Sequence, residues 1–61
     1  MSGDVAIAYD VYDAAKAVGI SPRTFEGMLQ RGRGPRITRV GRKRLIDRED
    51  LERWFKAQRT E

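Results

Sequence analysis

Residues 19–32 read GISPRTFEGMLQRG, a segment with a glycine at each end and a Ser-Pro pair near its start. Ser21 followed by Pro22 marks a helix start, because a serine hydroxyl accepts from early backbone N–H groups and proline tolerates the first helical position. Apolar residues at spacing i, i+3, i+4 predict one buried stripe, made of Phe25, Met28 and Leu29. We therefore predict a helix from Pro22 to about Arg31, ended by Gly32.

Another helix is predicted just before this one, over about residues 12–18. Asp10 can cap its start, Asp13 lies in its first turn, and Gly19 suits the left-handed position after a helix end. Residues 9–11 either form a short strand or lead into this helix. Two short helices joined by a three-residue turn containing glycine are typical of a helix-turn-helix.

The remaining sequence predicts a β-hairpin and a closing helix. Two runs of strand-forming residues, 36–40 and 43–47, flank the dipeptide Gly41-Arg42. Asp47 can cap a third helix, whose apolar stripe is Leu51, Trp54 and Phe55. The order helix, turn, helix, hairpin, helix predicts a mainly α fold with a small β-hairpin wing, a winged helix-turn-helix.

A chain of 61 residues makes one small domain, near the lower size limit for folding alone. We expect residues 9–58 to form the domain, and residues 1–8 and 59–61 to be tails. Apolar side chains must supply the core, because there is no cysteine for disulfides or zinc. On the hairpin we expect Ile37 and Val40 to face this core, with the cations on the other side and at the tip. The aromatic core residues are expected to be Tyr9, Tyr12, Phe25, Trp54 and Phe55.

Positive charge is concentrated in residues 31–44, RGRGPRITRVGRKR, which hold seven basic residues and no acidic one. The other residues carry a net charge of −3, because six are basic and nine acidic. A local cationic patch indicates a polyanionic partner. The alternatives are a solvated loop that keeps the protein soluble, and a flexible AT-hook-like peptide over residues 31–35. The flanking helix and strand favour an ordered connector over that peptide.

Several function classes are disfavoured by composition. No catalytic site, metal or cofactor is expected, since the chain has no histidine and no cysteine. Its local carboxylate cluster is explained by helix capping and surface charge. No run of 18 apolar residues exists, so no membrane partner is expected. The absence of cysteine fits a reducing cytoplasm.

The segments SPRTFEGMLQRG and GPRITRVGRKRLIDREDLERWF together resemble the small excisionase and AlpA-type proteins, whose domain is similar to the MerR winged helix. The resemblance lies in a Ser-Pro-Arg-Thr helix start, a Gly-Pro before the first wing strand, an Arg-Val-Gly-Arg wing and an Asp-Leu-x-x-Trp in the closing helix. It covers about residues 9–56. It implies DNA binding, with the second helix in the major groove and the wing against the minor groove or backbone.

By this resemblance, DNA contacts are implied at the helix start and in the wing, at Ser21, Arg23, Thr24, Arg39, Gly41, Arg42 and Lys43. The chain departs from the family at Glu26 and Gly27, where larger or basic side chains are usual. That departure bears on which DNA sequence is read. Ile46 replaces an aromatic residue of many relatives, which we interpret as a packing change.

The chemistry of the second helix supports these contacts. Arg23 can reach a guanine edge or a phosphate, and a solvated arginine is disfavoured there because a helix N-terminus repels cations. Thr24 either contacts phosphate or thymine, or assists the cap. Gln30 and Arg31 lie two turns further on, where they either touch DNA or form a polar outer face.

Two residues of this helix leave opposite interpretations open. Glu26 either accepts from a cytosine amino group or pairs along the helix with Gln30 or Arg23. Gly27 either permits close approach of the backbone to DNA or relieves a clash with the first helix. Arg42, at the hairpin turn, is expected to enter the minor groove, where negative potential is concentrated. The full set of expected DNA contacts is Ser21, Arg23, Thr24, Gly27, Gln30, Arg31, Arg33, Arg36, Arg39, Arg42, Lys43 and Arg44.

The function expected from these observations is sequence-specific binding and bending of double-stranded DNA. By resemblance, the protein is an excisionase of a mobile element such as a phage, which helps an integrase run site-specific recombination towards excision in a bacterial cytoplasm. An AlpA-like or MerR-like transcriptional regulator is the main alternative. An RNA-binding accessory protein and a module for an acidic protein partner are further ones. MerR relatives dimerise through a coiled coil after the domain, whereas this chain stops at Glu61. We therefore expect a monomer in solution and cooperative self-association on DNA.

Overall fold

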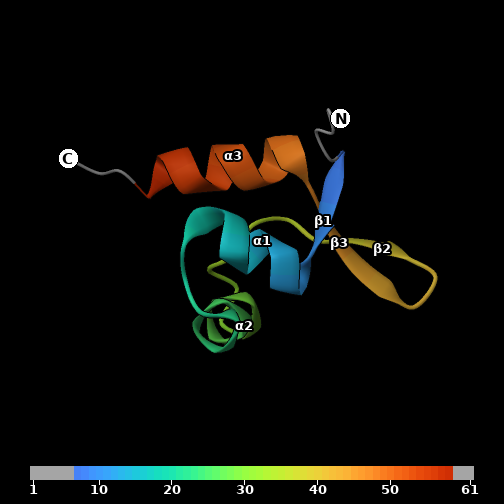
Figure 1. Ribbon diagram of the computed structural model, residues 1–61, viewed down its shortest axis with the longest axis horizontal. Coiled ribbons are helices and arrows are strands. Elements are labelled where there is room, and N and C mark those ends of the chain that lie inside the picture. The colour runs from blue at the N-terminus through green and yellow to red at the C-terminus, as the bar shows by residue number, and fades with distance from the viewer. Residues whose placement is uncertain (1–6, 59–61) are drawn as a thin grey trace.

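The computed structural model describes residues 7–58 and shows in them three helices and one antiparallel sheet of three strands. The elements, in chain order, are β1 (Ala8–Asp10), α1 (Val11–Val18), α2 (Pro22–Gln30), β2 (Thr38–Val40), β3 (Lys43–Asp47) and α3 (Arg48–Ala57). Figure 1 shows α1 between α3 and α2, with the β2–β3 hairpin projecting beyond the helices. The predicted winged helix-turn-helix fold is confirmed.

The helix starts follow the capping chemistry predicted from the sequence. The Asp10 carboxylate accepts from the Asp13 N–H at 2.7 Å, and α1 begins at Val11, one residue earlier than predicted. Gly19 ends α1 with a φ of 81°, a left-handed conformation that costs glycine little. Helix α2 stops at Gln30, one residue before its predicted end.

The structure divides residues 9–11 between the two alternatives, since Tyr9 and Asp10 belong to a strand and Val11 is the first residue of α1. Strand β1 pairs antiparallel with β3, with Tyr9 opposite Ile46, and the strand order is β1-β3-β2. Because β1 begins at Ala8, the sheet includes the last residue of the segment 1–8 that was expected to be a tail. The rest of that segment up to residue 6, and residues 59–61, lie outside the described part of the chain.

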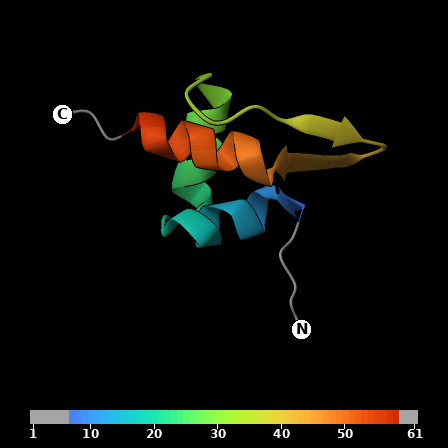
Figure 2. The same ribbon diagram turned by 90° about the horizontal axis from the view of Figure 1, so that it is seen from above.

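The wing is a hairpin with a two-residue turn. Val40 lies opposite Lys43, so Gly41 and Arg42 make the turn, as predicted. Gly41 has a φ of 62°, as in a type II′ turn, whose first central residue is glycine. Seen from above in Figure 2, β2 and β3 extend together away from the three helices. Strand β2 is shorter than predicted, since it begins at Thr38 rather than residue 36.

The core lies where α1, α2, α3 and β3 meet. Phe25 and Ile46 are its largest fully buried side chains, and burial of each stabilises the fold by about 1.5–3 kcal/mol. The Trp54 ring packs edge-on against Phe25, with centroids 5.7 Å apart. The buried set is completed by smaller aliphatic side chains on α1 and by one leucine on α3, which are Val11, Ala14, Ala15 and Leu51.

Three residues predicted to be buried are exposed, with relative accessibilities of 62% for Tyr12, 57% for Val40 and 47% for Phe55. Val40 is exposed because strand side chains alternate, so a residue three positions after Ile37 points to the opposite face. Tyr12 lies about 100° round the helix from buried Val11. Phe55 lies on α3 beside α1, where Ala17 and Val18 leave a shallow groove open to solvent.

No helix within residues 7–58 has both the length and the apolar character needed to cross a bilayer. The same residues contain no group of three or more acidic, histidine or cysteine side chains placed to hold a metal ion.

Candidate nucleic-acid interface

The outward face of α2 is polar and includes the residues expected to read DNA. Phe25 turns into the core, and the opposite face carries Arg23, Thr24, Gly27, Gln30 and the C-cap residue Arg31. Of these, Gly27 is half-buried and the other four are exposed. An exposed helix face of this composition can approach base edges, because arginine and glutamine side chains match guanine and adenine edges respectively.

Ser21 and Thr24 are joined by two hydrogen bonds at the start of α2. The Ser21 hydroxyl accepts from the Thr24 N–H at 3.1 Å and donates to Thr24 Oγ1 at 2.9 Å. Both functions of the Ser21 hydroxyl are therefore used within the cap. Because Thr24 Oγ1 accepts in this bond, the proton of the Thr24 hydroxyl is not used in it and can be donated to an acceptor such as a phosphate oxygen.

Arg31 folds back over Gly27. An added Cβ at Gly27 would lie 3.6 Å from the nearer Nη atom of Arg31, which is ordinary contact. Because Gly27 has no side chain, the outward face of α2 has a shallow depression there, and the Arg31 guanidinium group lies across it. Relief of a clash with α1, one of the two interpretations of Gly27, has no support in these contacts.

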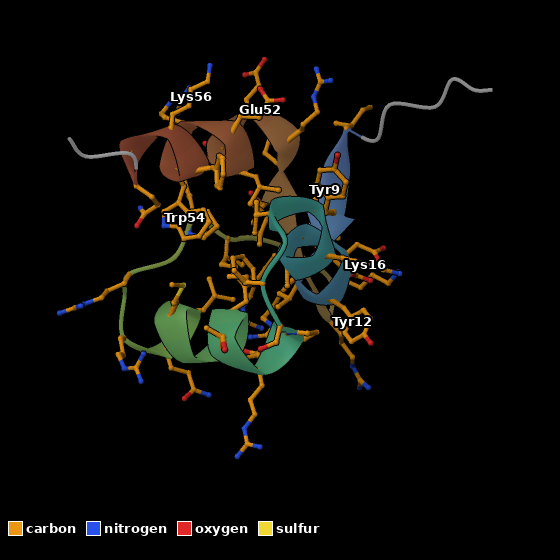
Figure 3. All side chains as sticks on the ribbon, turned by 60° about the vertical axis from the view of Figure 1, so that its left-hand side comes forward. Tyr9, Tyr12, Lys16, Glu52, Trp54 and Lys56 are labelled. Atoms are coloured by element: carbon orange, nitrogen blue, oxygen red, sulfur yellow. The ribbon has the colours of Figure 1, made fainter. Side chains whose placement is uncertain are left out.

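The connector between α2 and β2 is ordered. The Arg33 N–H donates to the Met28 carbonyl at 2.8 Å, and the Arg33 carbonyl accepts from the Trp54 indole Nε1 at 2.8 Å. Figure 3 shows Trp54 pointing from α3 towards the body of the molecule, whereas Glu52 and Lys56 point away from it. A Cβ at Gly34 would lie 2.5 Å from a methyl carbon of Leu29, so the backbone packs closely there. The predicted ordered connector is thus confirmed over a flexible peptide.

The side chains of Arg33 and Arg36 are exposed on this fixed connector. They lie between the end of α2 and the first wing strand, so the connector continues the basic surface from one element to the other. Trp54 is a contributor to this arrangement that sequence reasoning assigned only to the core. Its indole N–H could have indicated this hydrogen bond from the sequence, because a half-buried tryptophan usually donates to a partner.

The two faces of the wing differ from those expected. Arg39 lies directly opposite Arg44 across the strands, so their side chains share a face. Ile46 is on that same face of β3, two residues from Arg44, and it is buried. The expectation that all wing cations point away from the core is therefore wrong for Arg39 and Arg44. Val40 and Lys43 share the other face, next to Arg42 at the turn.

Glu26 binds Arg44, not Gln30 or Arg23 as the sequence suggested. The two guanidinium Nη atoms of Arg44 donate to the two carboxylate oxygens of Glu26, at 2.5 and 3.3 Å. This hydrogen bonding, with the charge of Arg44, lowers the pKa of Glu26 below its ordinary value, and the same bond raises that of Arg44. Within residues 7–58, Arg44 is the one cation of the 31–44 stretch that forms an ion pair.

The structure thus places the expected residues in three adjoining groups: the outward face of α2, the ordered connector and the wing. Two groups of cations, on the connector and at the wing tip, are left available for a polyanion. Residues 8–59 match the family model described as a helix-turn-helix domain. A search of curated proteins finds none that matches this chain.

Proposed function

Because the chain belongs to the helix-turn-helix domain family, we propose that it is a sequence-specific protein that binds and bends double-stranded DNA, of the excisionase type. Such a protein sets the direction of integrase-mediated recombination. Helix-turn-helix domains read duplex DNA by laying the second helix in the major groove. In this chain that helix is α2.

One observation carries the DNA-binding part of the proposal. The helix α2, with its polar outward face, is followed along the chain by six basic residues. None of the six has an ion-pair partner among residues 7–58. These residues are Arg31, Arg33, Arg36, Arg39, Arg42 and Lys43. An uncompensated cationic surface beside a base-reading helix matches the division of labour in protein–DNA contacts, in which phosphate contacts position the protein and base contacts specify the sequence.

In this proposal α2 supplies sequence recognition. Arg23 and Gln30 contact base edges, and Thr24 donates its free hydroxyl proton to a phosphate. The low surface at Gly27 lets the helix backbone approach the groove, while Ser21 acts through the cap that orients Thr24. Arg31 lies across this surface in the free protein, so its side chain turns to a base or the adjacent phosphate when the backbone at Gly27 approaches the groove.

The wing and the connector supply affinity and the bend. Arg42 at the hairpin turn enters the minor groove, and Arg39 and Lys43 flank it on the adjacent phosphates. Arg33 and Arg36 neutralise phosphates between the two grooves. Bending is favoured because asymmetric neutralisation and minor-groove insertion on one side repay the energy needed to deform the duplex.

The excisionase assignment rests on the sequence resemblance of residues 9–56. It implies action in the bacterial cytoplasm on nucleoid DNA, with an integrase as protein partner and with several copies bound cooperatively on neighbouring sites. A small reading surface supports the need for several copies, since one α2 contacts few base pairs. A transcriptional regulator of the AlpA type would use the same surface.

The test is to incubate the protein with sheared DNA from its source genome at about 150 mM salt, a concentration at which non-specific binding is weak, and to sequence the retained fragments. Enrichment of closely spaced repeats beside a recombinase gene supports the excisionase. Enrichment at promoters replaces it with a regulator. Retention of random fragments alone would reject sequence-specific binding and direct the search to RNA or acidic proteins.

A further inference from the structure

We propose that the Glu26–Arg44 pair is a joint that sets the position of the wing relative to α2, and that Arg44 acts as a positioning residue instead of a phosphate contact. The inference rests on the proposed function, because it concerns how two parts of one DNA-binding surface are held in register. It also makes a statement about the free protein, which can be tested without DNA.

The geometry of the pair is suited to fixing an orientation. Both nitrogens of the guanidinium fork meet both oxygens of the carboxylate, and this two-bond arrangement restricts rotation as well as distance. The pair joins helix α2 to strand β3, 18 residues apart in the chain. Both side chains are about two-fifths exposed, at 39% and 37%, so the pair adds little net stability. Its effect is therefore on orientation more than on stability.

The pair also lies within the wing itself, where only the Val40–Lys43 pair separates Arg44 from the turn. On its core-facing side, β3 has Ile46 buried against the helices and Arg44 as the next residue outward. Beyond Arg44 the hairpin continues to the turn at Gly41 and projects from the body (Figure 2). Arg42, which is placed for the minor groove, is two residues from Arg44, so a shift at Arg44 is passed directly to the tip. Holding Arg44 therefore fixes the spacing between α2 and that tip.

Electrostatics at the wing supports the same role. Arg39 and Arg44 are directly opposite on adjacent strands, and like charges in this relation repel. Glu26 is the anion that neutralises one of them, which reduces this repulsion across the hairpin. The carboxylate that the sequence places on the recognition helix, where basic residues are usual, thereby has a function other than reading cytosine.

The direction in which Glu26→Gln changes DNA affinity distinguishes a joint from a simple charge effect. Glu26→Gln removes a negative charge near the DNA surface, so electrostatics alone would raise DNA affinity. The joint requires the opposite, a loss of at least fivefold for the preferred fragment, because the wing is no longer held in register. Glu52→Gln is the matched control, since it makes the same charge change on the outer side of α3 (Figure 3).

The first measurement uses the free protein. The chain has no cysteine, so Gln30→Cys and Arg42→Cys accept two spin labels, one on α2 and one at the wing tip. Pulsed electron paramagnetic resonance then reports the distribution of distances between them. We expect a narrow distribution with Glu26, a broad one with Glu26→Gln, and a narrow one again in the charge-swapped pair Glu26→Arg with Arg44→Glu. Circular dichroism confirms that each variant is folded.

The second measurement uses the genomic fragment most enriched by the parent protein. Glu26→Gln should bind it at least fivefold more weakly, and Glu52→Gln at least as tightly as the parent. The log–log salt slope should be the same in Arg44→Gln as in Glu26→Gln, because both substitutions break the same pair. A slope smaller by about 0.9 in Arg44→Gln than in Glu26→Gln would show that Arg44 neutralises a phosphate, which overturns the proposal.

The proposed function and the joint can be rejected independently of each other. If no fragment is enriched, the proposed function fails and the distance distributions alone decide the joint. If Glu26→Gln keeps the narrow distribution, or binds the enriched fragment as tightly as Glu52→Gln does, the joint is rejected while DNA binding stands.

Discussion

The indole Nε1 of Trp54 donates a hydrogen bond of 2.8 Å to the backbone carbonyl oxygen of Arg33. This bond ties α3, the last helix, to the connector that carries Arg33 and Arg36 between α2 and the wing. The same indole packs edge-on against Phe25 of α2. Trp54 thus joins three segments, and the order of the basic connector depends on a residue remote from it in sequence.

Trp54→Phe should keep most of the packing and lose the hydrogen bond. Because the Arg33 carbonyl can turn to water at this exposed site, we expect a loss of about 0.5–1.5 kcal/mol in the free energy of unfolding. Urea denaturation followed by circular dichroism measures it. Phe55→Leu on the exposed side of α3 is the control and should change stability by less than about 0.5 kcal/mol. Equal effects of the two substitutions would contradict the role given to Trp54.

Gly34→Ala should destabilise the protein. The new Cβ would lie 2.5 Å from a methyl carbon of Leu29 and 3.2 Å from its Cγ, so either the Leu29 side chain, which packs against the core, or the connector must shift. A forced shift of this kind costs about 1–3 kcal/mol.

Gly27→Ala provides the opposite case. It meets no atom closer than 3.6 Å and lies inside α2, so it should stabilise the fold by about 0.5–1 kcal/mol. The affinity of this variant for DNA should nevertheless fall, because the added methyl group fills the depression on the outward face of α2. A variant that is both more stable and tighter in binding would show that α2 does not approach DNA at Gly27.

Arg42→Ala should make DNA binding less dependent on salt. If four to six phosphates are neutralised, the log–log slope of affinity against salt is about −3.5 to −5.5, and loss of one contact changes it by about 0.9. Lys56→Ala is the control, since it removes the same charge from the outer side of α3, where Lys56 points away from the body (Figure 3). Fluorescence anisotropy with a labelled duplex measures both slopes. An unchanged slope for Arg42→Ala would remove the wing tip from the interface.

The stabilising effect of Glu26 should disappear in acid. Its pKa in the folded protein lies below the ordinary value of 4.5, chiefly through the hydrogen bond from Arg44. The contribution is therefore complete above a pH of about 4.5 and is lost as the pH falls through the lower, folded-state pKa. We expect Glu26→Gln to be less stable than the parent at neutral pH, with a difference that shrinks below a pH of about 4.5. Denaturation across this pH range, with Glu52→Gln alongside, measures it; a difference that persists in acid would contradict the assignment.

The sequence was sufficient for the elements because their signals are local. Ser21-Pro22 and Asp10 cap helices by contacts within four residues, and Gly41-Arg42 meets the needs of a two-residue turn. The spacing of Phe25 and Leu29 likewise identified the buried side of α2. The DNA contacts inferred from these positions stay predictions, which the Arg42→Ala and Gly27→Ala variants test.

Long-range relations were harder to predict. The partner of Glu26 lies 18 residues away, and the local pairs at i, i+3 and i+4 offered by Gln30 and Arg23 were the only ones the helix pattern could suggest. The prediction that Phe55 is buried was wrong for a related reason. A stripe at helical spacing shows which side faces inward, but how far the neighbouring α1 extends decides whether the end of that stripe is covered. Val40 could have been placed correctly by counting alternate residues from Ile37.

Whether α2 and the wing form one DNA-binding surface is tested most directly by the change in backbone amide NMR signals when a duplex of the enriched sequence is added. We expect large shifts in residues 23–31 and 39–44, smaller ones in the connector, and none on the outer side of α3 near Glu52 and Lys56. Shifts centred on the groove between α1 and α3, or confined to the wing with α2 unaffected, would contradict it.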